Sequence, residues 1–140
     1  GEDFAYPIPD PFSDAQAAPL LCAGVIGYRT LRLADIADGQ KIGLFGFGAS
    51  AHIVIQIVKH KFPNSPVYVF TKTVRHAELA ESLGAAWTGC SGDLPPEKLN
   101  KIMDFTPVGE CVRDALGVLE RGGRLVINAI RKEPPVPLLD

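Results

Sequence analysis

The sequence predicts an α/β protein in which a doubly wound parallel sheet carries helices on both faces. Short apolar stretches rich in β-branched and aromatic residues alternate with amphipathic stretches of about ten residues, the pattern of strand–helix–strand units. The clearest unit is KIGLFGFGASAHIVIQIVKHK at 41–61, where an apolar strand leads into a glycine turn and then a helix. With 140 residues, 46% of them apolar, the chain can bury the core of one domain.

Each element can be placed from its local sequence. Four prolines among the first nineteen residues predict irregular extended backbone before a first helix, which Ser13 or Asp14 can cap. Gly84 is suited to end a helix, and Gly122-Gly123 to make a turn before the last strand. The strands are expected at 41–45, 67–70, 85–88, 101–105 and 124–127, and the helices at 16–20, 23–34, in the part of 41–61 after the turn, at 75–83 and at 110–119.

The glycine turn fits G-x-G-x-x-A, the fingerprint of a Rossmann-type dinucleotide-binding fold. Gly46 can make the tight turn after the strand, and Gly48 has no side chain to keep a pyrophosphate from the backbone. The small Ala51 lets the helix pack close to the strand, while the free N–H groups of the helix start favour an anion. After the turn, Ile53, Ile57 and Val58 form an apolar face, which indicates the helix that this fingerprint requires. The predicted nucleotide-binding turn consists of Gly46, Phe47, Gly48, Ala49, Ser50 and Ala51.

Bulk composition narrows the range of partners. A net charge of −2 without a basic run argues against nucleic acid or an anionic membrane. The apolar stretches are too short for a membrane span, and no charged-then-apolar leader opens the sequence, so a cytoplasmic protein is expected. Cys22, Cys90 and Cys111 are odd in number and far apart, which fits neither a disulfide framework nor a C-x-x-C zinc site.

Four blocks of the sequence together resemble one enzyme family. They are PLLCAGVIGYRTL at 19–31, GFGASAH at 46–52, ELAESLGA at 78–85 and GGRLVINAI at 122–130. They are similar to the zinc-type alcohol dehydrogenases of the medium-chain dehydrogenase/reductase superfamily, in this order and over nearly the whole chain. Members of that family are much longer, so the chain looks like an excised cofactor-binding domain. The resemblance implies that residues 1–36 are the tail of a catalytic domain with connecting helices, and that 37–140 are an NAD(P)-binding Rossmann domain, incomplete at its C-terminus.

The resemblance makes Cys22 a metal-ligand candidate. In the family the cysteine of this block is one ligand of the catalytic zinc, which needs three protein ligands and an open position. The other ligands match nothing in this sequence, so the chain alone is expected to hold no catalytic zinc and to be inactive. From the residues alone, a lone cysteine in an apolar helix is more often a small buried side chain. Ile26 stands where the family usually has a threonine that contacts the cofactor.

The choice between NAD and NADP depends on the end of the second strand. An NAD site has a carboxylate there to bind the ribose hydroxyls, whereas this chain has Thr71, followed by Lys72, Arg75 and His76. A hydroxyl flanked by cations can accommodate a 2′-phosphate. We therefore predict NADP(H) in preference to NAD(H), the alternative being that these cations are solvated charges at a helix start.

Two further loops follow predicted strands at their carboxyl ends, where open α/β sheets bind ligands. In the family these loops line the nicotinamide half of the cleft. The residues implied are Thr106, Pro107 and Val108 after the fourth strand, and Asn128, Ala129 and Ile130 after the fifth. Without the family they would be ordinary loops. No catalytic residue is expected within the chain itself.

The intact protein is expected to be an oxidoreductase that transfers a hydride between NAD(P)(H) and a small alcohol or aldehyde, and to be a homo-oligomer. One alternative is a zinc-free reductase of the same superfamily, similar to the quinone reductases, which would need no cysteine at position 22. A Rossmann-like methyltransferase would want an acidic residue at position 71. A stand-alone nucleotide-sensing module is the third alternative. The chain on its own is expected to expose apolar surface.

Overall fold

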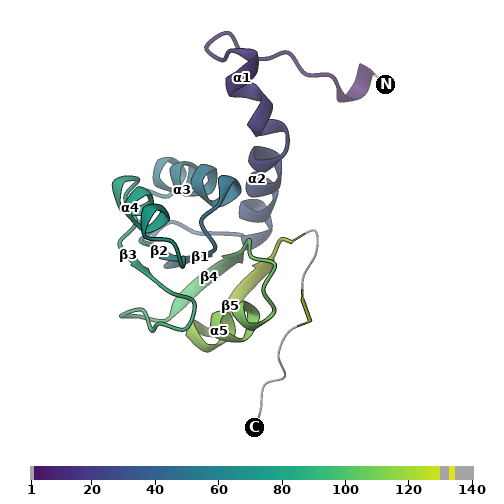
Figure 1. Cartoon of the computed structure of the whole chain (residues 1–140). Coiled ribbons are helices and arrows are strands. Elements are labelled where there is room, and N and C mark those ends of the chain that lie inside the picture. The colour runs from purple at the N-terminus through teal and green to yellow at the C-terminus, as the bar shows by residue number, and fades with distance from the viewer. Residues whose placement is uncertain (1, 130–132, 135–140) are drawn as a thin grey trace.

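A computed structural model describes residues 2–129 and 133–134 of the chain. Five strands form one sheet in the order β3-β2-β1-β4-β5, and every neighbouring pair is parallel. Because the chain moves outward from β1 in one direction and then in the other, helices cover both faces of the sheet (Figure 1). The predicted doubly wound α/β fold is confirmed.

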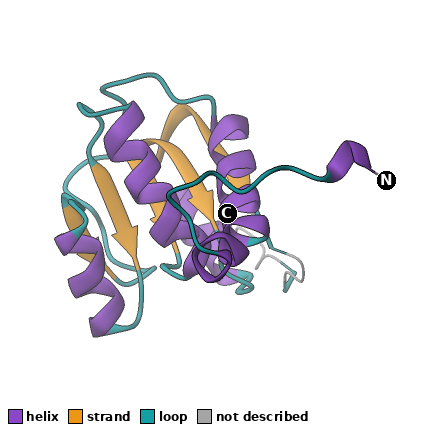
Figure 2. Ribbon diagram, turned by 90° about the horizontal axis from the view of Figure 1, so that it is seen from above, coloured by secondary structure: helices purple, strands orange, loops and turns teal. Residues whose placement is uncertain are grey.

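The elements follow the alternation expected from the sequence (Figure 2). The α-helices are α1 (Asp14–Ala17), α2 (Ala23–Ala34), α3 (Ala49–Lys61), α4 (Val74–Ser82) and α5 (Glu110–Val118), with single 3₁₀ turns η1 (Glu2–Phe4) and η2 (Ala18–Leu21). The strands are β1 (Ile42–Phe45), β2 (Val67–Phe70), β3 (Trp87–Gly89), β4 (Leu99–Asp104) and β5 (Leu119–Ile127).

Alternate side chains of the central strands enter two separate cores. Leu44 of β1 and Val69 of β2 point to one face, where they pack with residues of α2, α3 and α4. Phe45 and Phe70 point to the other face, where α5 covers them. The rings of Phe45 and Phe70 are stacked with their centroids 4.0 Å apart. A strand buried on both faces reads as a continuous apolar run, which is why these strands could be predicted.

Several predicted boundaries are wrong in detail. β5 begins at Leu119 rather than at 124, because Leu119 already pairs with Leu99 of β4. The pairing register then shifts between Leu99 and Lys101, where Gly122-Gly123 lie opposite β4 as an irregularity of the strand. The predicted helix at 16–20 is divided into α1 and η2, since Pro19 cannot donate a helical hydrogen bond. Ser13 forms the predicted cap, as part of a capping box with Gln16.

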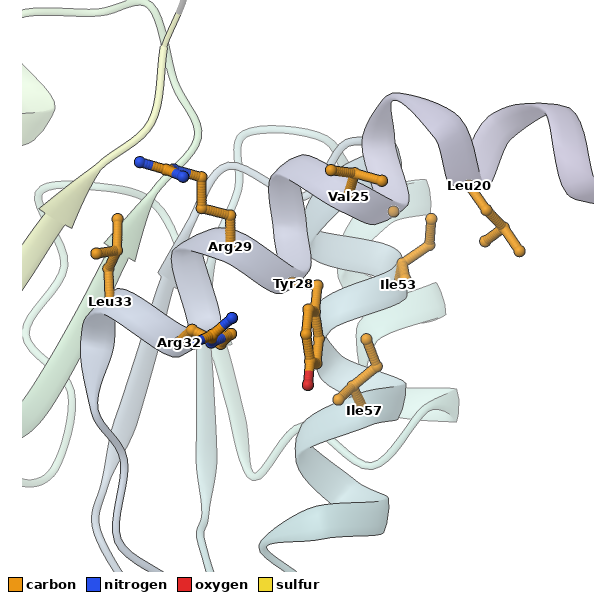
Figure 3. Close-up of a pocket in the computed structure, with 9 residues that line it drawn as sticks. Leu20, Val25, Tyr28, Arg29, Arg32, Leu33, Ile53 and Ile57 are labelled. Atoms are coloured by element: carbon orange, nitrogen blue, oxygen red, sulfur yellow. The ribbon is translucent and has the colours of Figure 1, made fainter. Parts of the chain in front are cut away.

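The apolar face predicted for α3 is also partly wrong. Val58 is fully buried against the sheet, but Ile53 and Ile57 are only half-buried. Both line a hollow between α2 and α3 (Figure 3), and Ile57 also packs against the core on this face of the sheet. No helix in the described part of the chain is long and apolar enough to cross a membrane.

Candidate nucleotide-binding site

The carboxyl ends of three neighbouring strands lie level at one edge of the sheet. Phe45, the last residue of β1, is paired with Phe70 at the end of β2 and with Asp104 at the end of β4. The loops that leave these strands therefore meet above the same edge. In open α/β sheets this edge, at the point where the chain reverses direction across the sheet, is where ligands bind.

The glycine turn after β1 adopts the geometry that its sequence predicts. Gly46 has φ = +80°, and its N–H donates to the carbonyl of Phe70 at 2.8 Å. A Cβ on Gly46 would lie 2.8 Å from the Cγ2 atom of Thr106, so no larger residue fits between the two loops. Gly48 is the N-cap of α3, and a Cβ there would meet nothing within 4 Å. The turn is thus closed on its inner side and open where a ligand could approach.

The start of α3 is suited to an anion. No side chain of the described residues caps this helix, whose N-cap is Gly48. The first N–H groups of α3 therefore have no side-chain acceptor, and the helix dipole adds positive potential at this end. Ala51 is fully buried in the first turn, in agreement with its predicted role in close packing.

A cavity of about 250 Å³ lies beside this turn, between the loops that follow β1, β2 and β4. Nine of the residues predicted to bind a cofactor line it, and they come from all three loops: Gly46, Phe47, Gly48, Thr71, Lys72, His76, Thr106, Pro107 and Val108. Residues predicted separately, far apart in the sequence, are thus brought together. Phe45 and Phe70, whose rings are stacked, also line the cavity.

Other predicted residues do not line this cavity. Ala49 and Ser50 follow Gly48 in α3, and the buried Ala51 faces the core. Arg75 is exposed in the first turn of α4 and does not join Lys72 and His76 at the cavity wall. Asn128 and Ala129 follow β5, and Ile130 lies outside the described residues.

Three residues of the region were missed from the sequence. Ser91, from the loop after β3, and Cys111, from the first turn of α5, both line the cavity. Cys111 is buried and belongs to the core that contains Phe45 and Phe70. No local motif marks either position: Ser91 reaches the cavity from the loop after β3, and Cys111 from the helix that follows β4.

The third missed residue is Asp104, the last residue of β4. It is fully buried, and its Oδ1 accepts hydrogen bonds from the backbone N–H of Thr106 at 2.8 Å and from the Thr106 hydroxyl at 2.7 Å. These bonds fix the loop that faces Gly46 across the turn. A charged residue at the end of an apolar strand is a sequence signal that could have marked Asp104 as part of this site.

Asn128 supplies a further polar group near this edge. Its backbone N–H donates to the carbonyl of Asp104 at 2.8 Å, which holds the end of β5 beside that of β4. The side-chain Nδ2 atom is buried and has no hydrogen-bond partner among the described residues. A buried donor without a partner is costly in a folded protein, so this atom is available to a ligand acceptor.

The clearest electrostatic network lies away from the cavity. Tyr68 of β2 donates its hydroxyl hydrogen to Glu97 at 3.1 Å, and Glu97 forms an ion pair with Lys41 at 3.2 Å. Burial of Tyr68, followed by its bond to the carboxylate of Glu97, raises the pKa of its hydroxyl. The hydrogen bond from Lys41 lowers the pKa of Glu97. These residues tie the loop before β4 to the sheet.

Cys22 occupies the N-cap position of α2 and is exposed. Among the residues that the structure describes, no group of three His, Cys, Asp or Glu side chains could hold a metal ion. The described residues alone therefore do not fit a complete zinc site, and the metal-ligand role of Cys22 stays a prediction.

Known proteins with this sequence pattern are alcohol dehydrogenases. The chain is 43% identical over 127 residues to the probable alcohol dehydrogenase AdhA of Mycobacterium tuberculosis, which matches 91% of this chain and 36% of that protein. It is 32% identical over 137 residues to probable cinnamyl alcohol dehydrogenase 2 of Picea abies, covering 94% of this chain and 38% of the relative. No protein-family model matches the chain.

Solved structures agree on the fold. CAD from Helicobacter pylori, complexed with NADP(H), superposes with a TM-score of 0.75 at 26% identity, over 85% of this chain and 34% of that one. The short chain alcohol dehydrogenase of E. coli CFT073, complexed with NADH, gives a TM-score of 0.83 at 18% identity, over 96% of this chain and 42% of that one. The chain thus spans little more than a third of the relatives whose sequences it matches. The resemblance is confirmed: over nearly its whole length the chain is similar to a segment of known alcohol dehydrogenases, and its fold matches that of solved dehydrogenase structures.

Proposed function

We propose that this chain binds a nicotinamide dinucleotide at the carboxyl edge of its sheet. The observation that carries the proposal is one cavity lined together by residues of the glycine turn, by Thr71, Lys72 and His76, and by Thr106 to Val108. The site fits such a ligand. Gly48 leaves open space beside an uncapped helix start, and the buried Nδ2 atom of Asn128 lacks a partner among the described residues.

Each part of the dinucleotide has a proposed set of contacts. The N–H groups at the start of α3, from Ala49 to Ala51, would bind the pyrophosphate. The loop after β2 would hold the adenosine ribose, and the loop after β4 would line the nicotinamide half, with Asn128 to Ile130 beside it. Asp104 holds that second loop in place through Thr106. The bound nicotinamide supplies the hydride chemistry, which the chain's own residues do not provide.

We infer a preference for NADP(H). Thr71 is neutral, so no carboxylate would repel a 2′-phosphate, and Lys72 and His76 line the cavity next to it. Arg75 is exposed in the same helix start and would reach only a phosphate that projects from the cavity. The relatives include structures with NADP(H) and with NADH, so the preference rests on these side chains.

In the longer protein we propose an alcohol dehydrogenase activity, acting on an alcohol or aldehyde with Cys22 as one zinc ligand. The names of the relatives support the activity. Residues 1–36 would then belong with the catalytic part and 37–140 with the cofactor part, and the 140-residue chain alone would be inactive. The cytoplasmic location and the homo-oligomeric state of the intact protein stay predictions.

The proposal is tested by titrating the chain with NADPH and with NADH and recording the heat of binding. NADPH should bind more tightly, and Lys72→Ala should weaken NADPH by about fivefold to tenfold while leaving NADH nearly unchanged, as expected for one charge-assisted contact. Arg75→Ala is the matched variant outside the cavity and should have the smaller effect. Tighter binding of NADH would contradict the NADP preference. Failure of both cofactors to bind would contradict the proposed site.

A further inference from the structure

The wall of the nucleotide-binding cavity contains a side chain whose charge can change near neutral pH. His76, in the first turn of α4, lines this cavity together with Thr71 and Lys72 of the preceding loop. Histidine is the residue type that ordinarily gains or loses a proton between about pH 5 and about pH 8. The charge on this side of the cavity therefore depends on whether His76 is protonated.

The other side chains of the cavity lining do not change charge in this range. Lys72 is the second cation, and a lysine ordinarily stays protonated well above neutral pH. Across the cavity, α5 contributes the buried thiol of Cys111, and thiols ordinarily ionise only above about pH 8. The loops after β1, β3 and β4 contribute no charged side chain to the lining. Near neutral pH, His76 is thus the variable charge among the described residues of the cavity.

The elements around His76 carry further charged side chains that do not line the cavity. They are Arg75, Glu78 and Glu81 of α4, Asp93 of the loop after β3, Asp104 of β4, and Glu110, Arg113 and Asp114 of α5. Glu81 accepts a hydrogen bond from the Thr88 hydroxyl, and Asp93 accepts one from the backbone N–H of Cys90. Within the described part of the chain, no residue forms an ion pair with His76. No described carboxylate therefore neutralises its imidazole by direct contact.

The 2′-phosphate of NADP(H) is the group that this charge would recognise, given the cofactor site proposed above, on which the inference rests. A phosphate monoester carries nearly two negative charges above about pH 7, and its oxygens then only accept hydrogen bonds. A protonated imidazole donates to such an oxygen a charge-assisted hydrogen bond, about twice as strong as one between neutral groups. NAD(H) has a hydroxyl at this position, for which the charge of His76 should matter little.

We propose that His76 makes the cofactor preference of this chain depend on pH, with NADP(H) favoured most when the imidazole is protonated. Proton binding and phosphate binding are coupled reciprocally. Because the 2′-phosphate binds the protonated form more tightly, a bound phosphate also makes His76 hold its proton more tightly. NADP(H) binding therefore takes up protons near neutral pH, and its affinity falls as the pH rises. Lys72 keeps part of the preference at every pH.

Calorimetric titration of the full 140-residue chain with NADP⁺ and with NAD⁺, from about pH 6.5 to about pH 8.5, tests the proposal. In this range the 2′-phosphate has lost most of its second proton, so its own ionisation contributes little. The dissociation constant of NADP⁺ should rise by about threefold to fivefold, the size expected when one charge-assisted contact is lost. The dissociation constant of NAD⁺ should stay nearly constant.

Proton uptake can be measured directly in the same experiment. Near neutral pH, the heat of NADP⁺ binding should differ between two buffers of different ionisation enthalpy, because the buffer releases the proton that His76 takes up. The heat of NAD⁺ binding should be the same in both buffers. A merely structural role of His76 would not produce this difference between the cofactors.

Two substitutions of His76 separate its charge from its presence. His76→Gln should bind NADP⁺ at every pH about as tightly as the wild type does at alkaline pH. His76→Arg should keep the tight binding up to alkaline pH, a gain over the wild type that a poorly folded variant could not show. The matched control is His60→Gln, because His60 is exposed in the last turn of α3, away from the glycine turn, and this variant should retain the wild-type profile.

The outcomes distinguish this inference from the proposed cofactor site. If NADP⁺ binds with an affinity that does not change with pH, the inference is overturned and the cofactor site stands. The same holds if His76→Gln retains the pH dependence, or if NAD⁺ shows it equally. If neither cofactor binds, the proposed site is contradicted, and the inference is overturned with it.

Discussion

Two glycines of the same turn have opposite physical reasons for lacking a side chain. At Gly46 the positive φ and the contact with Thr106 leave no room within the protein itself. At Gly48 the backbone has φ = −89°, which any residue can adopt, and the neighbouring space is empty. The first glycine is needed by the fold, whereas the second is needed only if a ligand approaches.

Gly48→Ser tests this distinction. Serine is among the best N-cap residues, so the free energy of unfolding should be unchanged or rise by a few tenths of a kcal/mol, about 0.5 at most. The new hydroxyl would compete for the N–H groups of α3 and occupy the phosphate space. NADPH affinity should fall by about tenfold or more.

Urea unfolding and calorimetric titration measure the two effects of Gly48→Ser separately. Gly117→Ala, at an exposed glycine of α5 with open space around it, is the control that should leave cofactor affinity unchanged. If Gly48→Ser binds NADPH as tightly as the wild type, the proposed position of the pyrophosphate beside Gly48 is contradicted.

At the scale of elements, a glycine sets how closely α2 packs on α3. A Cβ on Gly27 would lie 2.8 Å from the Cγ2 atom of Val54 and 3.2 Å from the carbonyl oxygen of Ser50. Val54 is fully buried against the sheet and cannot move aside. The absence of a side chain at Gly27 therefore allows α2 and α3 to pack this closely. The same close packing sets the shape of the hollow between the two helices.

Gly27→Val should lower the free energy of unfolding by about 1–3 kcal/mol, because the helices must separate or distort. Gly117→Val is the matched control, since the same substitution at a helix glycine with free space should be neutral or slightly stabilising. Chemical denaturation followed by far-UV circular dichroism gives both values. Equal stabilities of the two variants would contradict the close packing of α2 on α3.

At the scale of the whole molecule, stability should depend on pH through Tyr68. The fold raises the pKa of this hydroxyl above its unfolded value of about 10, so folding favours the neutral form. The stabilisation is complete below pH 10 and is lost as the pH rises through the folded pKa. Tyr68→Phe should weaken this alkaline loss of the free energy of unfolding.

The alkaline effect is measured by urea unfolding at a series of pH values from 8 upward. Tyr6→Phe is the control, because Tyr6 is 82% exposed and the substitution leaves the sheet and its core unchanged. If Tyr68→Phe retains the full alkaline loss, another group is responsible for it.

Much of this organisation could be predicted from the sequence. β2 at 67–70 and α2 at 23–34 have the predicted bounds, because apolar runs and helical periodicity are local properties. The glycine turn was found for the same reason. The start of β5 was wrong, since the pairing of Leu119 with β4 is a contact between distant segments.

The candidate site also has a part that local sequence predicts and a part that depends on contacts between distant segments. The sequence by itself determined the doubly wound fold, the glycine turn and the resemblance to alcohol dehydrogenases, because strand, turn and helix signals lie within a few consecutive residues. Only the tertiary structure decided which residues share the cavity: it brought in Ser91 and Cys111, left Arg75 outside, and placed Thr106 against Gly46. The physical reason is that strand order and register bring loops together at one sheet edge, and both depend on packing across the whole core.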